Sequence, residues 1–124
     1  MKKTFKKAER LTGKTRIDHL FSTGESFFCY PFRVVFMPSD ASQVCPCRVL
    51  ITVPKRLHKT AVSRNLLKRR TREAYRLSKA AFYQRLGDKK IMMALLYSDK
   101  KVLDYKTIQD GVKVLENRVL DQIK

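Results

Sequence analysis

Positive side chains that could hold phosphate are concentrated in the stretch "SRNLLKRRTREAYR", residues 63–76. Six of its fourteen residues are Lys or Arg, and only Glu73 is acidic. Arginine offers a planar fork that donates two hydrogen bonds to a phosphate, and lysine offers a compact point charge. Ordinary solvated helix faces mix both signs of charge, so a run of one sign favours an anionic ligand over a plain surface.

A helix over this stretch places most of its cations on one side, because successive residues turn by about 100°. Like charges at i, i+4 repel one another, which favours a partner that neutralises them. Asn65 both donates and accepts, which suits a base edge or a 2′-hydroxyl. The expected stripe comprises Arg64, Asn65, Lys68, Arg69, Arg72 and Arg76. The opposite side is expected to hold Leu66, Leu67, Ala74 and Leu77, with Arg70 reaching along them to water.

The composition points to a nucleic-acid partner. The chain has 124 residues, a net charge of +17 and 44% hydrophobic residues, which predicts one folded domain over residues 1–124. Cationic side chains gain by displacing counterions from phosphates, and an anionic membrane surface is the second partner to consider. No run of 18 apolar residues and no signal peptide is present, so a cytoplasmic location is expected.

The elements that must position the cations follow from periodicity and from turn residues. The expected order is a helix over 17–22, a strand region over 26–37, a loop over 38–47, a strand over 48–53, a helix over 60–86, a strand over 91–97 and a last helix after Asp104. Gly24 and Gly87 are expected to end the first two helices, and Thr60 and Asp104 to cap the last two. The order predicts an α+β or α/β sandwich of a small sheet with helices.

Alternation within the strand region predicts which residues share a face. Phe32, Val34 and Phe36 are expected on one face, and Arg33 and Val35 on the other. Pro31 predicts a break or an edge position. The near-continuous apolar runs at 48–53 and 91–97 predict strands buried on both faces. In the last helix, one apolar stripe is expected at Ile108, Val112, Leu115, Val119 and Ile123.

Residues that could perform catalysis or hold a metal are sparse. Cys29, Cys45 and Cys47 are an odd number and have no second ligand pair, so small buried or loop thiols are favoured over a disulfide or a zinc site. No cluster of Asp and Glu suits two magnesium ions, the usual arrangement in protein nucleases. The adjacent Asp18-His19 is read as surface. His58 is read as a phosphate-contacting or plain loop residue rather than an acid–base group.

The stretch "AVSRNLLKRRTREAYR", residues 61–76, resembles the arginine-rich signature of the bacterial ribonuclease P protein component. Leu11 and "HLFSTG", ending at Gly24, are similar to that family's first helix and turn. "VPKR", residues 53–56, stands where the family has a strand followed by two basic residues. The resemblance covers nearly the whole chain, although only the 61–76 motif is specific.

The resemblance implies a ribosomal S5 domain-2-like fold, in the order α-β-β-β-α-β-α, with a left-handed crossover through the basic helix. It implies two RNA partners, the catalytic ribonuclease P RNA and precursor tRNA, and no membrane or small-molecule partner. The protein would be an accessory subunit without catalytic residues, and it would hold the 5′ leader between the first helix and the sheet. The RNA would perform the hydrolysis with Mg²⁺ that the protein does not hold.

Carried over by position, the resemblance implies two sets of site residues. The RNA-binding set is Lys55, Arg56, Arg64, Asn65, Lys68, Arg69, Arg72 and Arg76; the leader cleft is Ile17, Phe21, Arg33 and Val35. Four positions depart from the family pattern. Leu66 stands where the motif usually has Arg, Ile17 and Val35 stand where relatives can have aromatics, and His58 replaces a common Gly. Each base that stacks contributes about 1–3 kcal/mol, so leader stacking would depend mainly on Phe21.

Three other readings of the basic stretch stay open at the level of sequence. A ribosomal or assembly protein would also bind RNA without a nuclease role. A DNA-binding helix-turn-helix protein would place the basic helix in a major groove, but the preceding segment is predicted to be strand and loop. A membrane-surface helix would need an apolar face richer in Trp, Phe and Leu.

Overall fold

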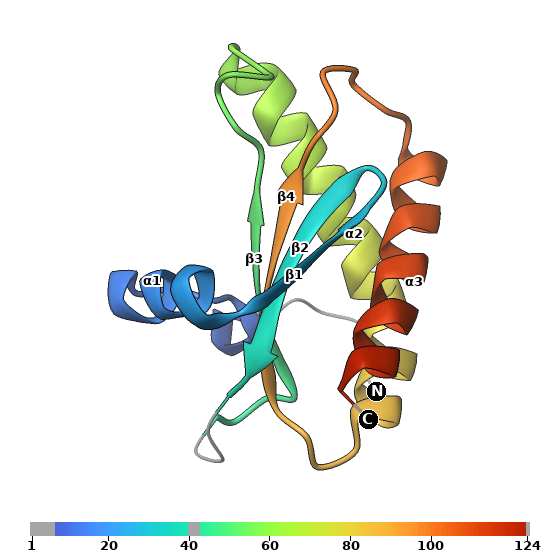
Figure 1. Ribbon diagram of the computed structural model, residues 1–124. Helices are drawn as coiled ribbons and strands as arrows, with labels where there is room; N and C mark the ends of the chain where they lie inside the picture. Colours follow the sequence, from blue (N-terminus) through green and yellow to red (C-terminus); the bar gives the residue numbers. More distant parts are fainter. Residues whose placement is uncertain (1–6, 40–42, 124) are drawn as a thin grey trace.

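A computed structural model describes residues 7–39 and 43–123 (Figure 1). The short 3-10 helix η1 (Lys7–Glu9) precedes α1 (Lys14–Thr23), β1 (Glu25–Cys29), β2 (Phe32–Pro38) and β3 (Cys47–Thr52). The long helix α2 (Ala61–Leu86), the strand β4 (Ile91–Tyr97) and the helix α3 (Tyr105–Gln122) complete the chain. The predicted α+β class and the order α-β-β-β-α-β-α are therefore confirmed.

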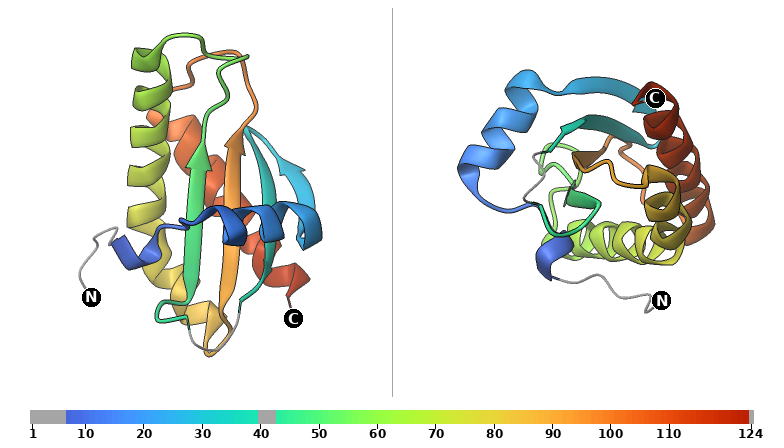
Figure 2. Two further views of the ribbon diagram at one scale, coloured as in Figure 1. Left: turned by 90° about the vertical axis from the view of Figure 1, so that its left-hand side faces the viewer. Right: turned by 90° about the horizontal axis from the view of Figure 1, so that it is seen from below.

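The four strands form one sheet in the order β1-β2-β4-β3. β1, β2 and β4 pair antiparallel, whereas β3 and β4 are parallel and are connected through α2. Viewed from the α1 side, β4 lies to the right of β3 and α2 runs behind the sheet (Figure 2, left). The crossover is thus left-handed, as the family resemblance implies and against the general preference for right-handed connections.

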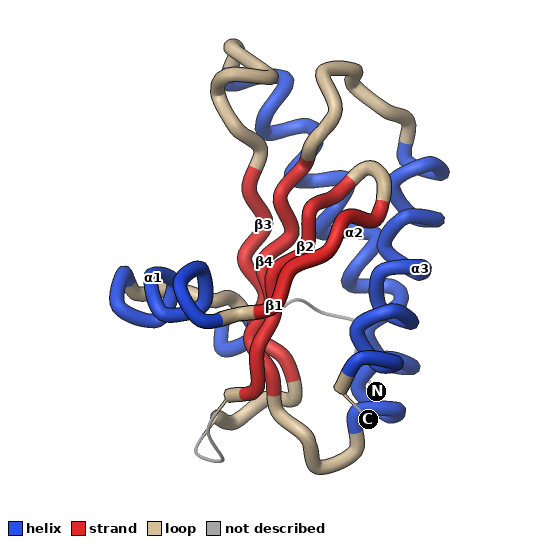
Figure 3. The backbone as a smooth tube through the Cα atoms, viewed as in Figure 1, coloured by secondary structure: helices blue, strands red, loops and turns tan. Residues whose placement is uncertain are grey.

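The helices divide between the two faces of the sheet, with α1 on one face and α2 and α3 on the other (Figures 2 and 3). Phe32, Val34 and Phe36 belong to the large core beneath α2 and α3, and Val35 to a smaller cluster beneath α1. The predicted alternation along this strand is confirmed. The sheet therefore presents one face, partly covered by α1, on which a ligand could lie.

The first helix and the third strand differ from their predictions. α1 begins at Lys14 rather than residue 17, because its first turn is polar and exposed and carries no apolar periodicity. β3 is an edge strand in which Leu50 and Ile51 are half-buried. The prediction that this strand is buried on both faces is therefore wrong. The central strand β4 is the one buried on both faces. An apolar run alone cannot separate these two positions in a sheet.

Helix caps and two glycines fix where the helices sit. Thr60 Oγ1 accepts from the Ser63 amide at 3.2 Å, and Asp104 Oδ1 accepts from the Thr107 amide at 2.9 Å, which confirms both predicted caps. A Cβ at Gly24 would lie 2.6 Å from the Leu20 carbonyl oxygen and 3.0 Å from Val35 Cγ1. A Cβ at Gly111 would lie 2.6 Å from Pro31 Cδ. Glycine therefore allows α1 to close on β2, and α3 to approach the β1–β2 turn.

Glu116, buried between α3 and α2, should make stability fall as pH rises. Burial raises its pKa to about 8, although Ser78 donates a hydrogen bond to Glu116 Oε2 at 3.0 Å. The unfolded chain releases this proton near the ordinary glutamate pKa, so the stabilisation is complete below that value and is lost as pH rises toward 8. Between pH 5 and 7 we expect a loss of about 2–3 kcal/mol. Urea unfolding at several pH values measures it, and Glu116→Gln should flatten the profile; an unchanged slope would contradict the assignment.

Candidate nucleic-acid interface

The predicted cationic stripe on α2, called the α2 stripe below, begins beside the loop that follows β3 and continues down the helix. It comprises Arg64, Asn65, Lys68, Arg69, Arg72 and Arg76. Asn65, Arg69 and Arg72 are exposed, and Lys68 is half-buried. Within residues 7–39 and 43–123, Lys68, Arg69 and Arg72 form no ion pair. Their repulsion is thus not offset within the described chain, which is the condition expected of a phosphate-binding surface.

Two predicted stripe residues have partners of their own. The Arg64 Nη1 group donates to the carbonyl oxygens of His58 at 3.0 Å and Lys59 at 2.9 Å. Arg76 forms an ion pair of 2.5 Å with Glu73, and its hydrogen bonds hold the Glu73 pKa below the usual range. Arg64 therefore fastens the loop before α2, and the charge of Arg76 is locally balanced.

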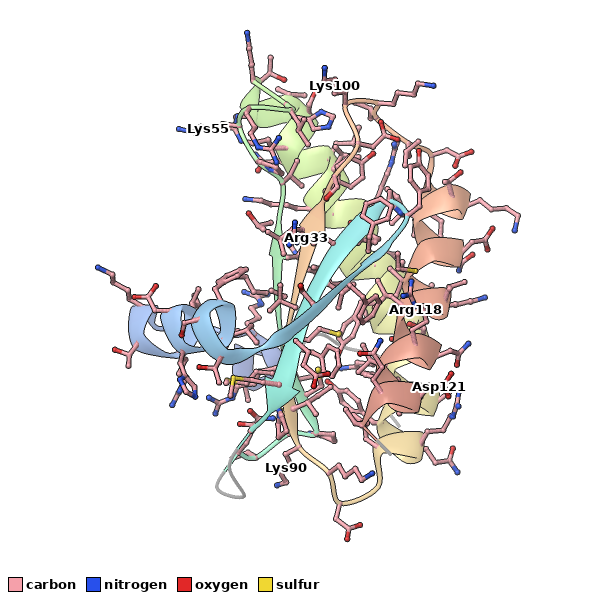
Figure 4. The ribbon with its side chains drawn as sticks, viewed as in Figure 1. Arg33, Lys55, Lys90, Lys100, Arg118 and Asp121 are labelled. Atoms are coloured by element: carbon pink, nitrogen blue, oxygen red, sulfur yellow. The ribbon has the colours of Figure 1, made fainter. Side chains whose placement is uncertain are left out.

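The predicted basic pair Lys55 and Arg56 is exposed in the loop between β3 and α2, and Lys55 lies on the outer side of this loop (Figure 4). This loop is anchored by His58, which is 5% exposed. The His58 ring contacts the Asp99 carbonyl oxygen through Nε2 at 2.7 Å and packs on Tyr97 at 5.4 Å between ring centroids. His58 is a loop residue, as predicted, but it is buried, and it joins this loop to the one after β4.

Removal of Arg64 should have two effects because its guanidinium holds the loop. Arg64→Ala is expected to lower the free energy of unfolding by about 1–3 kcal/mol through two lost charge-assisted hydrogen bonds, as well as to weaken RNA binding. Arg69→Ala, on the exposed face, should weaken RNA binding alone. Urea unfolding and RNA titration of both variants measure the difference. Equal stability of the two variants would contradict the loop-fastening role.

The apolar side of α2 matches its prediction only in part. Leu67 and Ala74 are buried and Leu66 is half-buried, whereas Leu77 is 38% exposed and belongs to no buried face. Arg70 is half-buried, and its Nη1 donates to the Leu103 carbonyl oxygen at 2.5 Å. Arg70 thereby ties α2 to the segment that leads into α3.

The predicted leader-cleft residues lie on the α1 side of the sheet. Leu20 packs inward from α1, and Ile17 and Phe21 lie on one flank of it. Phe21 is 43% exposed, and Arg33, on β2, is exposed between β1 and β4 (Figure 4). Val35 is 6% exposed, so it can form only the floor of a cleft. Among the four predicted residues, Phe21 and Arg33 are exposed, Ile17 is half-buried and Val35 is buried.

A small hollow of about 240 Å³ joins this face to the α2 stripe. Arg72 from α2 and Arg10 from the segment before α1 both line it, together with Val49 and Ile51 of β3. The Leu11 amide donates to the Val49 carbonyl oxygen at 2.9 Å, which holds that segment against the edge of β3. The α2 stripe therefore meets the α1 face at the edge strand β3, at a hollow that none of the four predicted leader-cleft residues lines.

A buried ionic cluster was missed by sequence reasoning. Lys79 Nζ lies 2.6 Å from both carboxylate oxygens of Glu9, and Tyr83 Oη donates to Glu9 Oε2 at 2.5 Å. The side chains of Lys79 and Glu9 are only 5% and 6% exposed. The sequence around Lys79 gives no local sign of such a partner, because Glu9 lies 70 residues away. The cluster fixes the segment that leads into α1.

The described residues that could hold a metal ion or act as catalytic groups do not gather at one place. Within the described ranges, no three His, Cys, Asp or Glu side chains gather into a group that could hold a metal ion. The three cysteines are free and buried, and burial raises the pKa of the Cys47 thiol well above its usual range. His19 Nδ1 faces Thr23 Oγ1 at 3.5 Å rather than its neighbour Asp18.

No helix in the described part of the chain is long and apolar enough to cross a membrane.

Comparison with known proteins identifies the family. The Ribonuclease P family model matches residues 5–119. The ribonuclease P protein component of Porphyromonas gingivalis is 33% identical over 109 residues, which is 86% of this chain and 80% of that protein. The RNase P protein structure of Staphylococcus aureus superposes with a TM-score of 0.74 at 20% identity, over 91% of this chain and 96% of that one. That of Thermotoga maritima gives 0.72 at 24% identity, over 89% and 96%. The family model and the curated relative both match most of this chain. The chain therefore belongs to the ribonuclease P protein component family.

Proposed function

We propose that this protein acts as the accessory subunit of ribonuclease P, binding the catalytic RNA through the α2 stripe and the 5′ leader of precursor tRNA on the α1 face. The RNA subunit then removes the leader to give the mature tRNA 5′ end. Mg²⁺ belongs to the RNA subunit in this proposal, and no step is assigned to a metal on the protein. A cytoplasmic location, where the two RNAs meet the protein, is part of the same proposal.

The observation that carries the proposal is the adjacency of two surfaces with different chemistry. Lys68, Arg69 and Arg72 present charge without an ion-pair partner in the described chain, which suits the phosphates of a structured RNA. Phe21 presents an exposed ring, which suits an unstacked base of a single strand. The hollow lined by Arg10 and Arg72 lies where the α2 stripe meets the α1 face at β3. A protein that holds a folded RNA and a neighbouring single strand together needs this arrangement.

Phe21→Ala tests the leader contact, because Phe21 is the exposed aromatic among the predicted cleft residues. The complex of protein and ribonuclease P RNA should lose about 1–3 kcal/mol of affinity for precursor tRNA, the amount that one stacked base contributes. Its affinity for mature tRNA, which lacks the leader, should stay unchanged. Equilibrium binding of both tRNAs to wild-type and variant complexes measures this.

The matched control is Phe28→Ala, which removes a more exposed ring, 56% against 43% for Phe21, from β1. Phe28 is close to Tyr30, at 6.5 Å between ring centroids, and is not part of the predicted cleft. The control complex should bind precursor and mature tRNA as wild type does. If Phe21→Ala weakens both tRNAs equally, the ring supports the fold or the RNA subunit, and the leader assignment is wrong.

A further inference from the structure

A hollow of about 290 Å³ lies between α2 and α3, which pack side by side (Figures 1 and 2). Its walls come from residues 77–85 of α2 and 113–120 of α3. Ala81, in this wall, lies about 180° around α2 from Arg72, because successive residues turn by about 100°. The hollow, called the α2–α3 hollow below, therefore faces away from the α2 stripe, and no predicted RNA-binding or leader-cleft residue lines it.

Glu116 brings a partly satisfied acid to the α2–α3 hollow. The residue is 5% exposed, and its Oε2 accepts a hydrogen bond from Ser78 at 3.0 Å. Its Oε1 has no hydrogen-bond partner in the described chain and is not completely shielded from solvent. Because burial raises the pKa of Glu116 to about 8, the side chain is a neutral acid at pH 7. A neutral carboxyl group has one O–H to donate, and with Ser78 on Oε2 this donor is Oε1.

The charged groups around Glu116 are all positive. Arg85 and Lys113 line the α2–α3 hollow, are exposed, and form no ion pair within the described ranges. The Arg85 Nη1 group donates to Asn117 Oδ1 at 2.6 Å, which holds the guanidinium at the rim. From the sheet, the Cys47 thiol is close enough to interact with Glu116, and burial raises the pKa of this thiol well above its usual range, so it is uncharged. The hollow therefore favours an anion.

The remaining wall of the α2–α3 hollow is apolar. Leu77 is 38% exposed and Ala81 is exposed, whereas Phe82 and Leu120 are buried beneath them. The wall from Leu77 to residue 85 follows α2 for about 12 Å, at 1.5 Å per residue. A hydrocarbon chain that lies along it would gain about fourfold in affinity for each CH₂ group removed from water.

We propose that the α2–α3 hollow binds an aliphatic carboxylate, whose oxygens accept from Glu116 Oε1 and pair with Lys113 while its chain lies on Leu77 and Ala81. The hollow is at the lower end of the range of small-molecule sites, about 300–1,000 Å³, which suits a chain of medium length. An ammonium ligand fits less well, because it would face Lys113 and Arg85 and would require Glu116 to lose its proton. The site does not depend on the ribonuclease role.

The test is titration of the isotope-labelled protein with octanoate, acetate and octylamine at pH 7, followed by amide NMR shifts. Octanoate should shift amides at 77–85 and 113–120 in a saturable way, at a Kd at least about tenfold below that of acetate. Octylamine, which has the same chain and the opposite charge, should leave these amides unshifted. Octanoate shifts spread over the whole basic surface would overturn the proposal, and so would equal affinity for octanoate and either control ligand.

Two variants of Glu116 test the acid as the donor. Glu116→Met keeps the bulk but removes the O–H, and should weaken octanoate binding on the order of tenfold. Glu116→Gln supplies an N–H in its place and should keep the wild-type affinity at pH 7. Binding to wild type should weaken about tenfold between pH 7 and pH 9, because Glu116 ionises with a pKa of about 8. Binding to the Gln variant should not change, and equal pH dependence of the two proteins would overturn the proposal.

Matched lysine variants separate this site from the general positive charge of the protein. Lys113→Ala removes an exposed cation that lines the α2–α3 hollow and should weaken octanoate binding severalfold. Lys106→Ala removes the same charge from the same helix, outside the hollow, and should leave binding unchanged. Equal weakening by both variants would overturn the proposal. No measurement uses RNA, so a failure here leaves the proposed role in ribonuclease P as it stands.

Discussion

Glu9→Ala should lower the free energy of unfolding by about 3–5 kcal/mol, because it leaves the Lys79 ammonium buried without its carboxylate. The two side chains are 2.6 Å apart and almost completely shielded from water. A single domain has a total stability of about 5–15 kcal/mol, so this loss is a large fraction of it. Glu9 also precedes Arg10 and Leu11, which lie along β3, so α1 should lose its fixed position. Urea unfolding of wild type and variant measures the effect.

A double variant shows whether the loss comes from the uncompensated charge. Replacement of a buried ion pair by apolar groups is often neutral, so Glu9→Leu with Lys79→Met should recover most of the lost stability. Glu73→Gln is the exposed control, since it breaks the surface pair with Arg76 and should cost little. If Glu9→Ala lowers the free energy of unfolding no more than Glu73→Gln does, the cluster is not a buried element of the folded protein.

Simultaneous replacement of Lys68, Arg69 and Arg72 by alanine should weaken binding to ribonuclease P RNA by about 3–6 kcal/mol, more than a hundredfold in Kd. These three cations have no ion-pair partner in the described structure, so their charge is available to phosphates. Each phosphate contact contributes about −0.9 to the slope of log K against log salt. The slope should therefore become shallower by about 2.7 in the variant. RNA binding at several salt concentrations gives both quantities.

The control removes three exposed cations in or near α3, away from the α2 stripe and its preceding loop, with Lys89, Lys106 and Lys113 changed to alanine. Net charge falls equally, so any long-range attraction of RNA is reduced to the same extent. The control protein should keep the wild-type slope of log K against log salt and nearly all of the affinity for ribonuclease P RNA. If both triple variants lose the same affinity, RNA responds to total charge, and α2 is not the specific binding surface.

Much of the fold could be predicted because its signals are local. Alternation at Phe32, Val34 and Phe36, the caps at Thr60 and Asp104, and the stop at Gly24 each depend on neighbours within one turn or strand. The left-handed crossover is different. It came from the family resemblance, since pattern reasoning favours the opposite hand.

The candidate site could be predicted only as a set of exposed cations. Spacing along α2 placed Arg64 with the others, but a helical wheel carries no information on the loop that its guanidinium fastens. The burial of His58 depends on Tyr97 and Asp99, which are far away in sequence.

Cleavage of precursor tRNA across a magnesium titration tests the central claim most directly. The purified protein is mixed with a bacterial ribonuclease P RNA, and release of the 5′ leader is followed with each component alone as a control. The account predicts rapid release by the mixture at magnesium too low for the RNA alone, and none by the protein alone. RNA binding without any stimulation at limiting magnesium would contradict the account and would make the protein an RNA-binding module without a role in leader removal.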